Sequence, residues 1–168
     1  VITGAGRGFC SGADMDALQV VSDRGDGASA SAGRRGPHET TLIPKPVIAA
    51  LNGVAAGAGA SLAFACDLRI LADSAGYNLA FANVALSCDT GASYHLQRLV
   101  GRAKAIELLY FPGTISAEES LALGLATRVV PADELAVTAR ETAARLAAGP
   151  TVALGAIRRS VAYAAGHS

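Results

Sequence analysis

Short apolar runs separated by glycine and polar turns dominate the middle of this chain. Residues 47–51 form a continuous apolar run that ends at Asn52-Gly53, and residues 68–72 form a second run that is apolar except for Arg69. Short apolar runs bounded by turn residues are typical of strands buried on both faces of a parallel sheet. The pattern therefore predicts two buried strands, with shorter strands ending at residue 3 and spanning residues 127–130.

Helical patterns lie between and after these runs. Residues 57–65 are small and apolar, which predicts a closely packed helix. Further helices are predicted at residues 93–100, 103–110 and 117–123, and Ser116 followed by Glu119 is a capping-box pattern for the last of them. Because strands alternate with helices, the pattern predicts an α/β architecture.

The last part of the chain predicts two amphipathic helices, each with its apolar positions on one face. The first set is Leu135, Ala139, Thr142 and Leu146, and the second is Leu154, Ile157, Val161 and Ala164. We expect one domain over residues 1–168, with a core at residues 1–130 and an incomplete helical part at 131–168. Residues 14–21 predict a short helix, and residues 22–36, rich in Gly, Ser, Ala and Arg, predict a flexible loop.

Composition limits the kinds of function to consider. The chain has 168 residues, of which 51% are hydrophobic and 17% charged, and its formal net charge is zero. One domain with a sizeable core is expected, without the basic surface that binds nucleic acid or membranes. Cys10, Cys66 and Cys88 are too widely spaced for a metal-binding pair or a disulfide framework, which favours a reducing, cytoplasmic location. The chain opens as a strand end and stops within a helical pattern, so we expect truncation at both ends.

Carboxylates are scarce in the apolar middle of the chain. Between residues 40 and 106 they are Asp67, Asp73 and Asp89. Asp67 opens a predicted strand and Asp73 lies in a turn, so structural roles are favoured for both. Asp89 precedes a predicted helix, where it is either the N-cap or a catalytic acid/base; the residues alone favour the cap.

Glycines before residues 57–65 offer a second candidate for chemistry. In Gly57-Ala58-Gly59-Ala60-Ser61, the first N–H groups of the predicted helix have no partner within it and lie at the positive end of its dipole. They are able to hold a developing enolate oxygen. The alternative, slightly favoured by the residues alone, is that small residues permit close packing.

The opening residues 1–8 look like the first βα turn of a short-chain dehydrogenase. The pattern fails because Cys10 replaces the last expected glycine and neither Tyr77 nor Tyr94 is followed four residues later by lysine. The histidines, His38, His95 and His167, are isolated, and His95 is assigned to a helix surface or to packing.

Five segments in order resemble the crotonase superfamily, the enoyl-CoA hydratase/isomerase family. The segments are residues 8–14, 45–59, 65–70, 89–101 and 117–126. The resemblance implies a ClpP-like spiral of repeated ββα units, here truncated at both ends. It also implies an acyl-CoA thioester as partner, assembly into a homotrimer or hexamer, and no cofactor or metal beyond the coenzyme A of the substrate.

The resemblance assigns residue roles as well. It places the two oxyanion-hole N–H groups at Ala13 and Ala58, and it lays residues 11–15 along coenzyme A. The binding residues it implies are Ser11, Gly12, Ala13, Asp14, Met15, Gly57 and Phe81.

The family's two hydratase glutamates map onto Ser61 and Phe81, neither of which transfers a proton as a carboxylate does. Asp89 matches the position where some members, such as enoyl-CoA isomerases, carry a catalytic aspartate. The resemblance therefore favours double-bond isomerisation with Asp89 as acid/base. Three alternatives stay open: hydration with water placed by Asp89, a non-catalytic acyl-CoA-binding homologue, and dehalogenation, for which His38 is poorly spaced.

Overall fold

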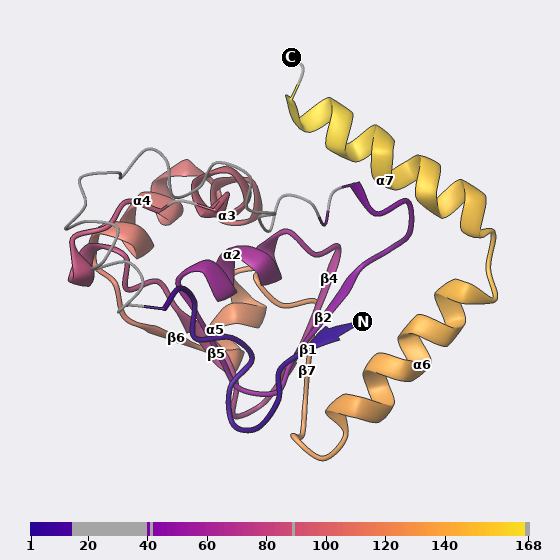
Figure 1. The fold of residues 1–168 in the computed structure, drawn as a ribbon, viewed down its shortest axis with the longest axis horizontal. Helices are drawn as coiled ribbons and strands as arrows, with labels where there is room; N and C mark the ends of the chain where they lie inside the picture. The colour runs from indigo at the N-terminus through magenta and orange to yellow at the C-terminus, as the bar shows by residue number, and fades with distance from the viewer. Residues whose placement is uncertain (15–39, 41, 89, 167–168) are drawn as a thin grey trace.

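The computed structural model describes residues 1–14, 40, 42–88 and 90–166. Its first sheet has the order β1-β2-β4-β7, and all neighbouring strands are parallel (Figure 1). These strands are β1 (Ile2–Thr3), β2 (Ile48–Leu51), β4 (Leu68–Ala72) and β7 (Arg128–Val130). Every residue of β2 is buried, which explains its uninterrupted apolar sequence. The strands predicted from the apolar runs are confirmed.

A second, three-stranded sheet was not predicted. It contains β3 (Val54–Ala56), β5 (Gly76–Asn78) and β6 (Thr114–Ser116), with β3 parallel and β6 antiparallel to β5. The chain passes from β2 to β3 and again from β4 to β5, each time moving from the first sheet to the second. Two strands followed by helical structure therefore occur twice, as expected for repeated ββα units.

The helices after these strands agree with the expected ranges. They are α2 (Ala58–Phe64), α3 (Ala92–Val100), α4 (Arg102–Tyr110) and α5 (Ala117–Ala122), with a short 3-10 helix η2 (Ala82–Val84) before α3. The Ser116 side chain accepts a hydrogen bond of 3.1 Å from the Glu119 N–H, so the predicted cap of α5 is confirmed.

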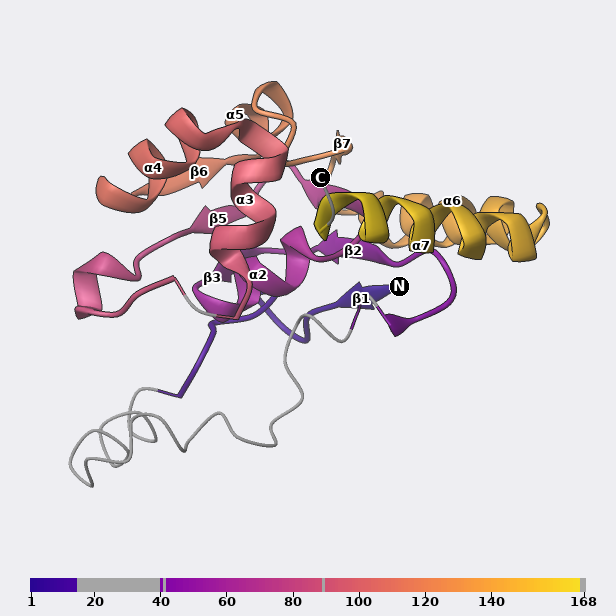
Figure 2. The same cartoon turned by 90° about the horizontal axis from the view of Figure 1, so that it is seen from above.

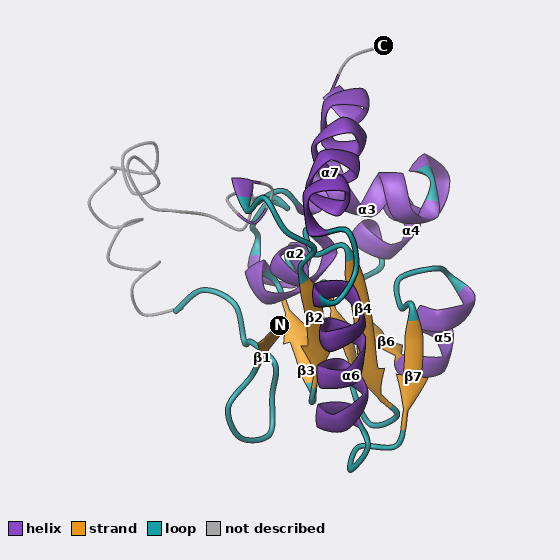
Figure 3. Ribbon diagram, turned by 90° about the vertical axis from the view of Figure 1, so that its right-hand side faces the viewer, coloured by secondary structure: helices purple, strands orange, loops and turns teal. Residues whose placement is uncertain are grey.

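The two C-terminal helices are α6 (Leu135–Ala147) and α7 (Thr151–Gly166), and α6 lies at the far end of the molecule from α4 (Figure 2). The end of α7 reaches α3, where Arg98 Nη2 donates to the Ala165 carbonyl at 2.8 Å. Helix α6 packs on β2 and β4 and buries Leu135 and Ala139, as its apolar face predicts (Figure 3). Helix α7 differs from the expectation of a buried face, because Ile157 is 59% and Val161 65% exposed.

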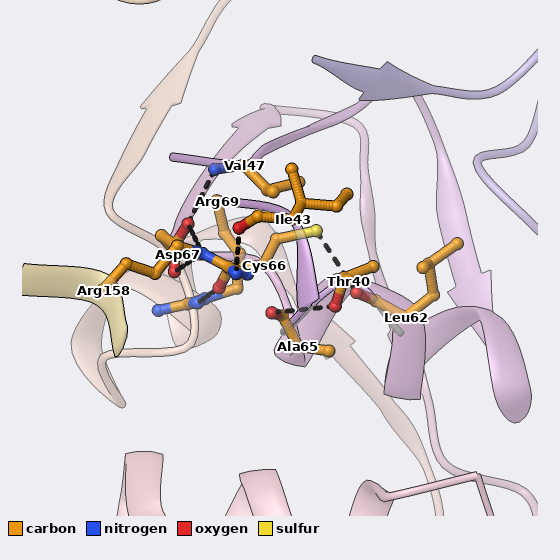
Figure 4. Close-up of polar contacts among 9 residues, drawn as sticks. All are labelled: Thr40, Ile43, Val47, Leu62, Ala65, Cys66, Asp67, Arg69 and Arg158. Atoms are coloured by element: carbon orange, nitrogen blue, oxygen red, sulfur yellow. Dashed lines mark hydrogen bonds and ion pairs between the residues drawn. The ribbon is translucent and has the colours of Figure 1, made fainter. Parts of the chain in front are cut away.

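Asp67 fastens α7 to the rest of the molecule. Its carboxylate accepts hydrogen bonds from the Val47 N–H at 2.6 Å and from Arg158 Nε at 2.7 Å, and Arg158 Nη1 donates to the Ile43 carbonyl at 2.8 Å (Figure 4). The Arg158 side chain is only 8% exposed. The structural role predicted for Asp67 is confirmed.

Some predictions fall outside the described residues, namely the flexible loop at 22–36 and all of the helix at 14–21 except Asp14. Within the part of the chain that the structure describes, no helix combines the length and the apolar character needed to cross a membrane.

Candidate active site

The N-terminal loop adds itself to β3 and so brings the predicted site segments together. Phe9 N–H donates to the Val54 carbonyl at 3.0 Å, and Ala56 N–H donates to the Cys10 carbonyl at 2.8 Å. Cys10 and Ala55 form a parallel bridge. Residues 9–12 therefore run beside β3 and reach the start of α2, which directly follows β3.

Close backbone contact continues at Gly12. This residue has φ +92°, and a Cβ atom there would lie 2.9 Å from the Ala56 carbonyl oxygen and 3.4 Å from the Ala58 nitrogen. Gly59 is equally restricted, since its Cβ would lie 2.4 Å from the Cys10 carbonyl oxygen. The close packing proposed for residues 57–61 is confirmed at Gly59, and Ala13 directly follows Gly12, whose backbone closely approaches Ala58.

Gly57 shapes the start of α2. It is the N-cap, with φ 49° and ψ −118°, and its N–H donates to the Asn78 carbonyl at 3.0 Å. Ala58 is the first helical residue, so its N–H has no acceptor within the helix. A backbone donor at Ala58 thus lies beside the segment that carries Ala13.

Phe81 and Ser61 form an uncharged wall next to this point. The Phe81 side chain is buried, and its Cε1 lies 3.9 Å from where a Cβ on Gly57 would be. Ser61 is fully buried, and its hydroxyl donates to the Gly57 carbonyl at 3.4 Å. Both side chains lie where the family resemblance expects hydratase glutamates, and neither supplies a carboxylate.

The remaining predicted residues are only partly described. Ser11, Ala13 and Asp14 are exposed. Met15 and Asp89, the predicted acid/base, lie outside the described residues.

The segment just after Asp89 is described. Thr90 has φ +51°, and the N-cap of α3 is Gly91, with φ +89° and no side-chain cap. The alternative that Asp89 is the N-cap residue is therefore wrong, because the N-cap is two residues later, at Gly91, and α3 starts at Ala92. Helix α3 packs on α2, the helix that begins at Ala58.

The structure locates His95 more specifically than the sequence, which assigned it to a helix surface or to packing. Its ring lies under the N-terminal turn of α3, with Cδ2 3.4 Å from where a Cβ on Gly91 would be. Burial, reinforced by Arg98 and Arg69, lowers the pKa of His95. The assignment to packing is consistent with this position, and its i, i+4 spacing from Gly91 was the signal available in the sequence.

Comparison with known proteins identifies the family to which the chain is similar. A model of the enoyl-CoA hydratase/isomerase family matches residues 1–166. The chain is 40% identical over 165 residues to the 1,2-epoxyphenylacetyl-CoA isomerase of Escherichia coli (strain K12), covering 96% of this chain and 63% of that protein. It is also 40% identical over 169 residues to a probable enoyl-CoA hydratase of Rhodobacter capsulatus, covering 95% of this chain and 62% of that protein.

Solved structures give the same result. A crystal structure of a putative enoyl-CoA hydratase/isomerase from Mycobacterium abscessus superposes with a TM-score of 0.90 at 30% identity, covering 99% of this chain and 65% of that one. The chain thus spans a little under two thirds of the length of these relatives. With the crotonase fold in place, this chain belongs to the enoyl-CoA hydratase/isomerase family.

Proposed function

We propose that this chain carries the active site of an acyl-CoA isomerase, in which Ala13 and Ala58 N–H groups hold the thioester oxygen. The observation that carries the proposal is the close approach of the Gly12 backbone to Ala58, whose nitrogen would lie only 3.4 Å from a Cβ on Gly12. Two N–H groups aimed at one carbonyl oxygen stabilise an enolate and so make the adjacent C–H more acidic. The segment at residues 11–15, which begins beside β3, is then available to lie along coenzyme A.

Asp89 is the proposed acid/base. It removes a proton next to the polarised carbonyl and returns it at another carbon, which moves a double bond. The proposal draws support from the uncharged wall of Phe81 and Ser61, since neither residue competes as a proton carrier. The name of the 40% identical isomerase relative agrees with this choice. Proton transfer of this kind needs no metal or redox cofactor.

Hydration is the second candidate, because an equally similar relative is named a probable enoyl-CoA hydratase. In that case Asp89 alone would position the attacking water. The two reactions leave different products, so one incubation separates them.

We further propose that the protein acts as a homotrimer or hexamer in the cytoplasm. The exposed aromatic side chains at the end of α4, Tyr110 at 72% and Phe111 at 78%, support association of subunits through this part of the molecule. Sedimentation velocity across a concentration series tests the assembly; a single monomeric species at all concentrations would refute it.

The central experiment is the substitution Asp89→Asn, with Asp73→Asn as the matched control. Asp73 is an exposed aspartate of the turn after β4, and its N–H donates to the Val130 carbonyl at the end of β7 at 2.8 Å. A 3-enoyl-CoA is supplied, and formation of the conjugated 2-enoyl-CoA is followed by absorbance. Asp89→Asn is expected to abolish turnover while binding of a saturated acyl-CoA, measured by calorimetry, is retained.

Each other outcome has a clear meaning. Unchanged turnover in Asp89→Asn would discard the role of Asp89. Accumulation of 3-hydroxyacyl-CoA from a 2-enoyl-CoA, detected by mass spectrometry, would favour hydration over isomerisation. Acyl-CoA binding without turnover across a substrate panel would identify a non-catalytic homologue.

A further inference from the structure

A cavity of about 470 Å³ lies between α3, α6 and α7, beside the turn that joins α2 to β4. Its volume falls within the range of about 300–1,000 Å³ that is usual for small-molecule sites. Its wall is mostly apolar and comes from all three helices. The residues that form this wall include Leu99, Leu146, Leu154, Ile157 and Val161.

Arg69 brings a buried positive charge to this cavity. The residue lines the cavity and is only 7% exposed. Its Nε donates to the Leu125 carbonyl at 2.9 Å. Its Nη1 donates to the Cys66 carbonyl at 2.7 Å (Figure 4). Both partners are neutral carbonyl groups, and Arg69 forms no ion pair within the described part of the chain. Its charge is therefore buried without a counter-charge, which is costly in an apolar setting.

One guanidinium nitrogen of Arg69, Nη2, remains to be accounted for. It is not among the donors that bond to described residues, whereas its other two nitrogens are. No enclosed side-chain nitrogen in the described residues lacks a hydrogen-bond partner, so this nitrogen is not enclosed. Since Arg69 is almost completely buried but lines the cavity, the cavity is the space that its free donor faces.

Arg98 supplies a second cation at the same cavity. Its Nη1 and Nη2 donate to the carbonyl groups of Tyr94 and Ala165, each at 2.8 Å, and its guanidinium carbon lies 3.6 Å from the Tyr94 ring centroid. It thereby connects α3 to the end of α7. The carboxylate of Asp67, which also lines the cavity, is occupied by Arg158.

His95 adds no positive charge to the cavity. It also lines the cavity, but burial lowers its pKa, so the neutral ring is favoured at pH 7. Arg69 and Arg98 therefore remain as cations without an acidic partner in the described residues. The cavity combines an apolar wall with two guanidinium groups, each with one nitrogen that bonds to no described residue, Nη2 of Arg69 and Nε of Arg98. Such charged donors are suited to a carboxylate.

We propose that this cavity binds an amphipathic carboxylate, with its carboxylate at Arg69 and Arg98 and its aliphatic or aromatic tail between α3, α6 and α7. The ligand neutralises Arg69 and covers the exposed apolar side chains of α7, Ile157 and Val161. Neutralising the cation and covering the apolar side chains both require a ligand that has a carboxylate and an apolar tail in one molecule.

This binding site is distinct from the proposed thioester site. The cavity includes Phe64 and Asp67 at the end of α2, whereas Gly57 and Ala58 lie at its start. With a rise of about 1.5 Å per residue, the two ends of this helix are about 9 Å apart. Neither Gly12 nor Phe81 lines the cavity.

Calorimetric titration of the protein with decanoate tests the proposal. Decanoate is expected to bind saturably at one site, and both decan-1-ol, which lacks the charge, and butyrate, which lacks the tail, at least tenfold more weakly. Arg98→Gln should weaken decanoate binding about tenfold, as expected for loss of one charge-assisted hydrogen bond. Arg102→Gln, which removes an exposed arginine at the start of α4 outside the cavity, should leave it unchanged.

A second pair of variants, both in α7, tests whether the tail of the ligand contacts the cavity wall. Ile157→Asp places a carboxylate in the cavity wall and should abolish decanoate binding, whereas Val152→Asp, at an 85% exposed position outside the wall, should not. Both positions are exposed, so both variants should fold. Excess octanoyl-CoA should leave decanoate binding unchanged.

Several results would overturn the proposal. Equal affinity for decanoate and decan-1-ol, or an unaltered affinity in Arg98→Gln, would remove the role of the cations. Displacement of decanoate by octanoyl-CoA would assign it to the thioester site instead. Absence of saturable decanoate binding, together with self-association that Ile157→Asp abolishes, would identify the cavity as an interface between copies of this chain.

Discussion

The substitution Gly12→Ala directly tests the backbone contact at the proposed oxyanion hole. An alanine Cβ at this position would lie 2.9 Å from the Ala56 carbonyl oxygen and 3.4 Å from the Ala58 nitrogen, so the backbone must move. Gly12 also has φ +92°, which side-chain-bearing residues rarely adopt. Strain of this kind costs about 1–3 kcal/mol.

The control variant Gly6→Ala separates the effect of backbone strain from the effect of displacing Ala13. Gly6 also has a positive φ, +73°, but a Cβ there would meet nothing within 4 Å. Both variants should lose stability in urea unfolding, Gly12→Ala by about 1–3 kcal/mol and Gly6→Ala by about 1 kcal/mol. Only Gly12→Ala moves Ala13 away from the start of α2.

The catalytic consequence should differ far more than the stability. A displacement of about 1 Å between catalytic groups can lower a rate about 100-fold. Gly12→Ala should therefore lose about 10- to 100-fold in kcat/KM for the enoyl-CoA substrate, measured well below its unfolding midpoint, whereas Gly6→Ala should stay near the wild-type value. Equal kcat/KM in the two folded variants would refute the inference that this contact positions the oxyanion donors.

Three further predictions concern charged and buried groups. Asp67→Asn should destabilise the protein by about 2–3 kcal/mol in urea unfolding, because Arg158 keeps a buried charge without its carboxylate, whereas Asp73→Asn should change stability by less than about 0.5 kcal/mol. The thiol of Cys66, whose pKa burial raises to about 11, should resist iodoacetamide at pH 8 in the folded protein and react after unfolding. Because burial lowers the pKa of His95, the histidine favours the folded state above pH 6.5, and this contribution is lost as the pH falls below that value. The variant His95→Gln should therefore show a smaller decline of the unfolding free energy in acid. An unchanged decline would contradict this prediction.

The strands that the sequence predicted are those whose burial requires a run of mostly apolar residues. Strands β2 and β4 lie inside a parallel sheet, β2 being continuously apolar and β4 apolar except for Arg69. The helices α2 and α5 begin at Gly57 and at the capping residue Ser116. Strands β3, β5 and β6 have three residues each, which is too short to display an alternating pattern. Their pairing depends on close approach instead, as at Gly76, where a Cβ would lie 2.4 Å from the Ile115 carbonyl oxygen.

Contacts between distant segments were harder to foresee. The structural role of Asp67 followed from its place before a strand, but nothing in the sequence identified Arg158, 91 residues later, as its partner. Likewise, the roles of Ala13 and Ala58 came from a family resemblance, whereas their proximity depends on the pairing of Cys10 with Ala55. For α7, periodicity predicted an apolar face without indicating how much of it the rest of the chain covers.

The two proposed binding sites lie at opposite ends of α2, which raises the question of whether they are coupled. Coupling requires an element with two arrangements that each ligand favours differently. Helix α2 is unsuited to that role, because Ala60 and Ala63 are fully buried and a Cβ on Gly59 would already clash with the Cys10 carbonyl. A close-packed helix of this kind resists sliding. Saturating decanoate should therefore leave the affinity for octanoyl-CoA unchanged, and a cooperative change in either direction would mean that α2 moves.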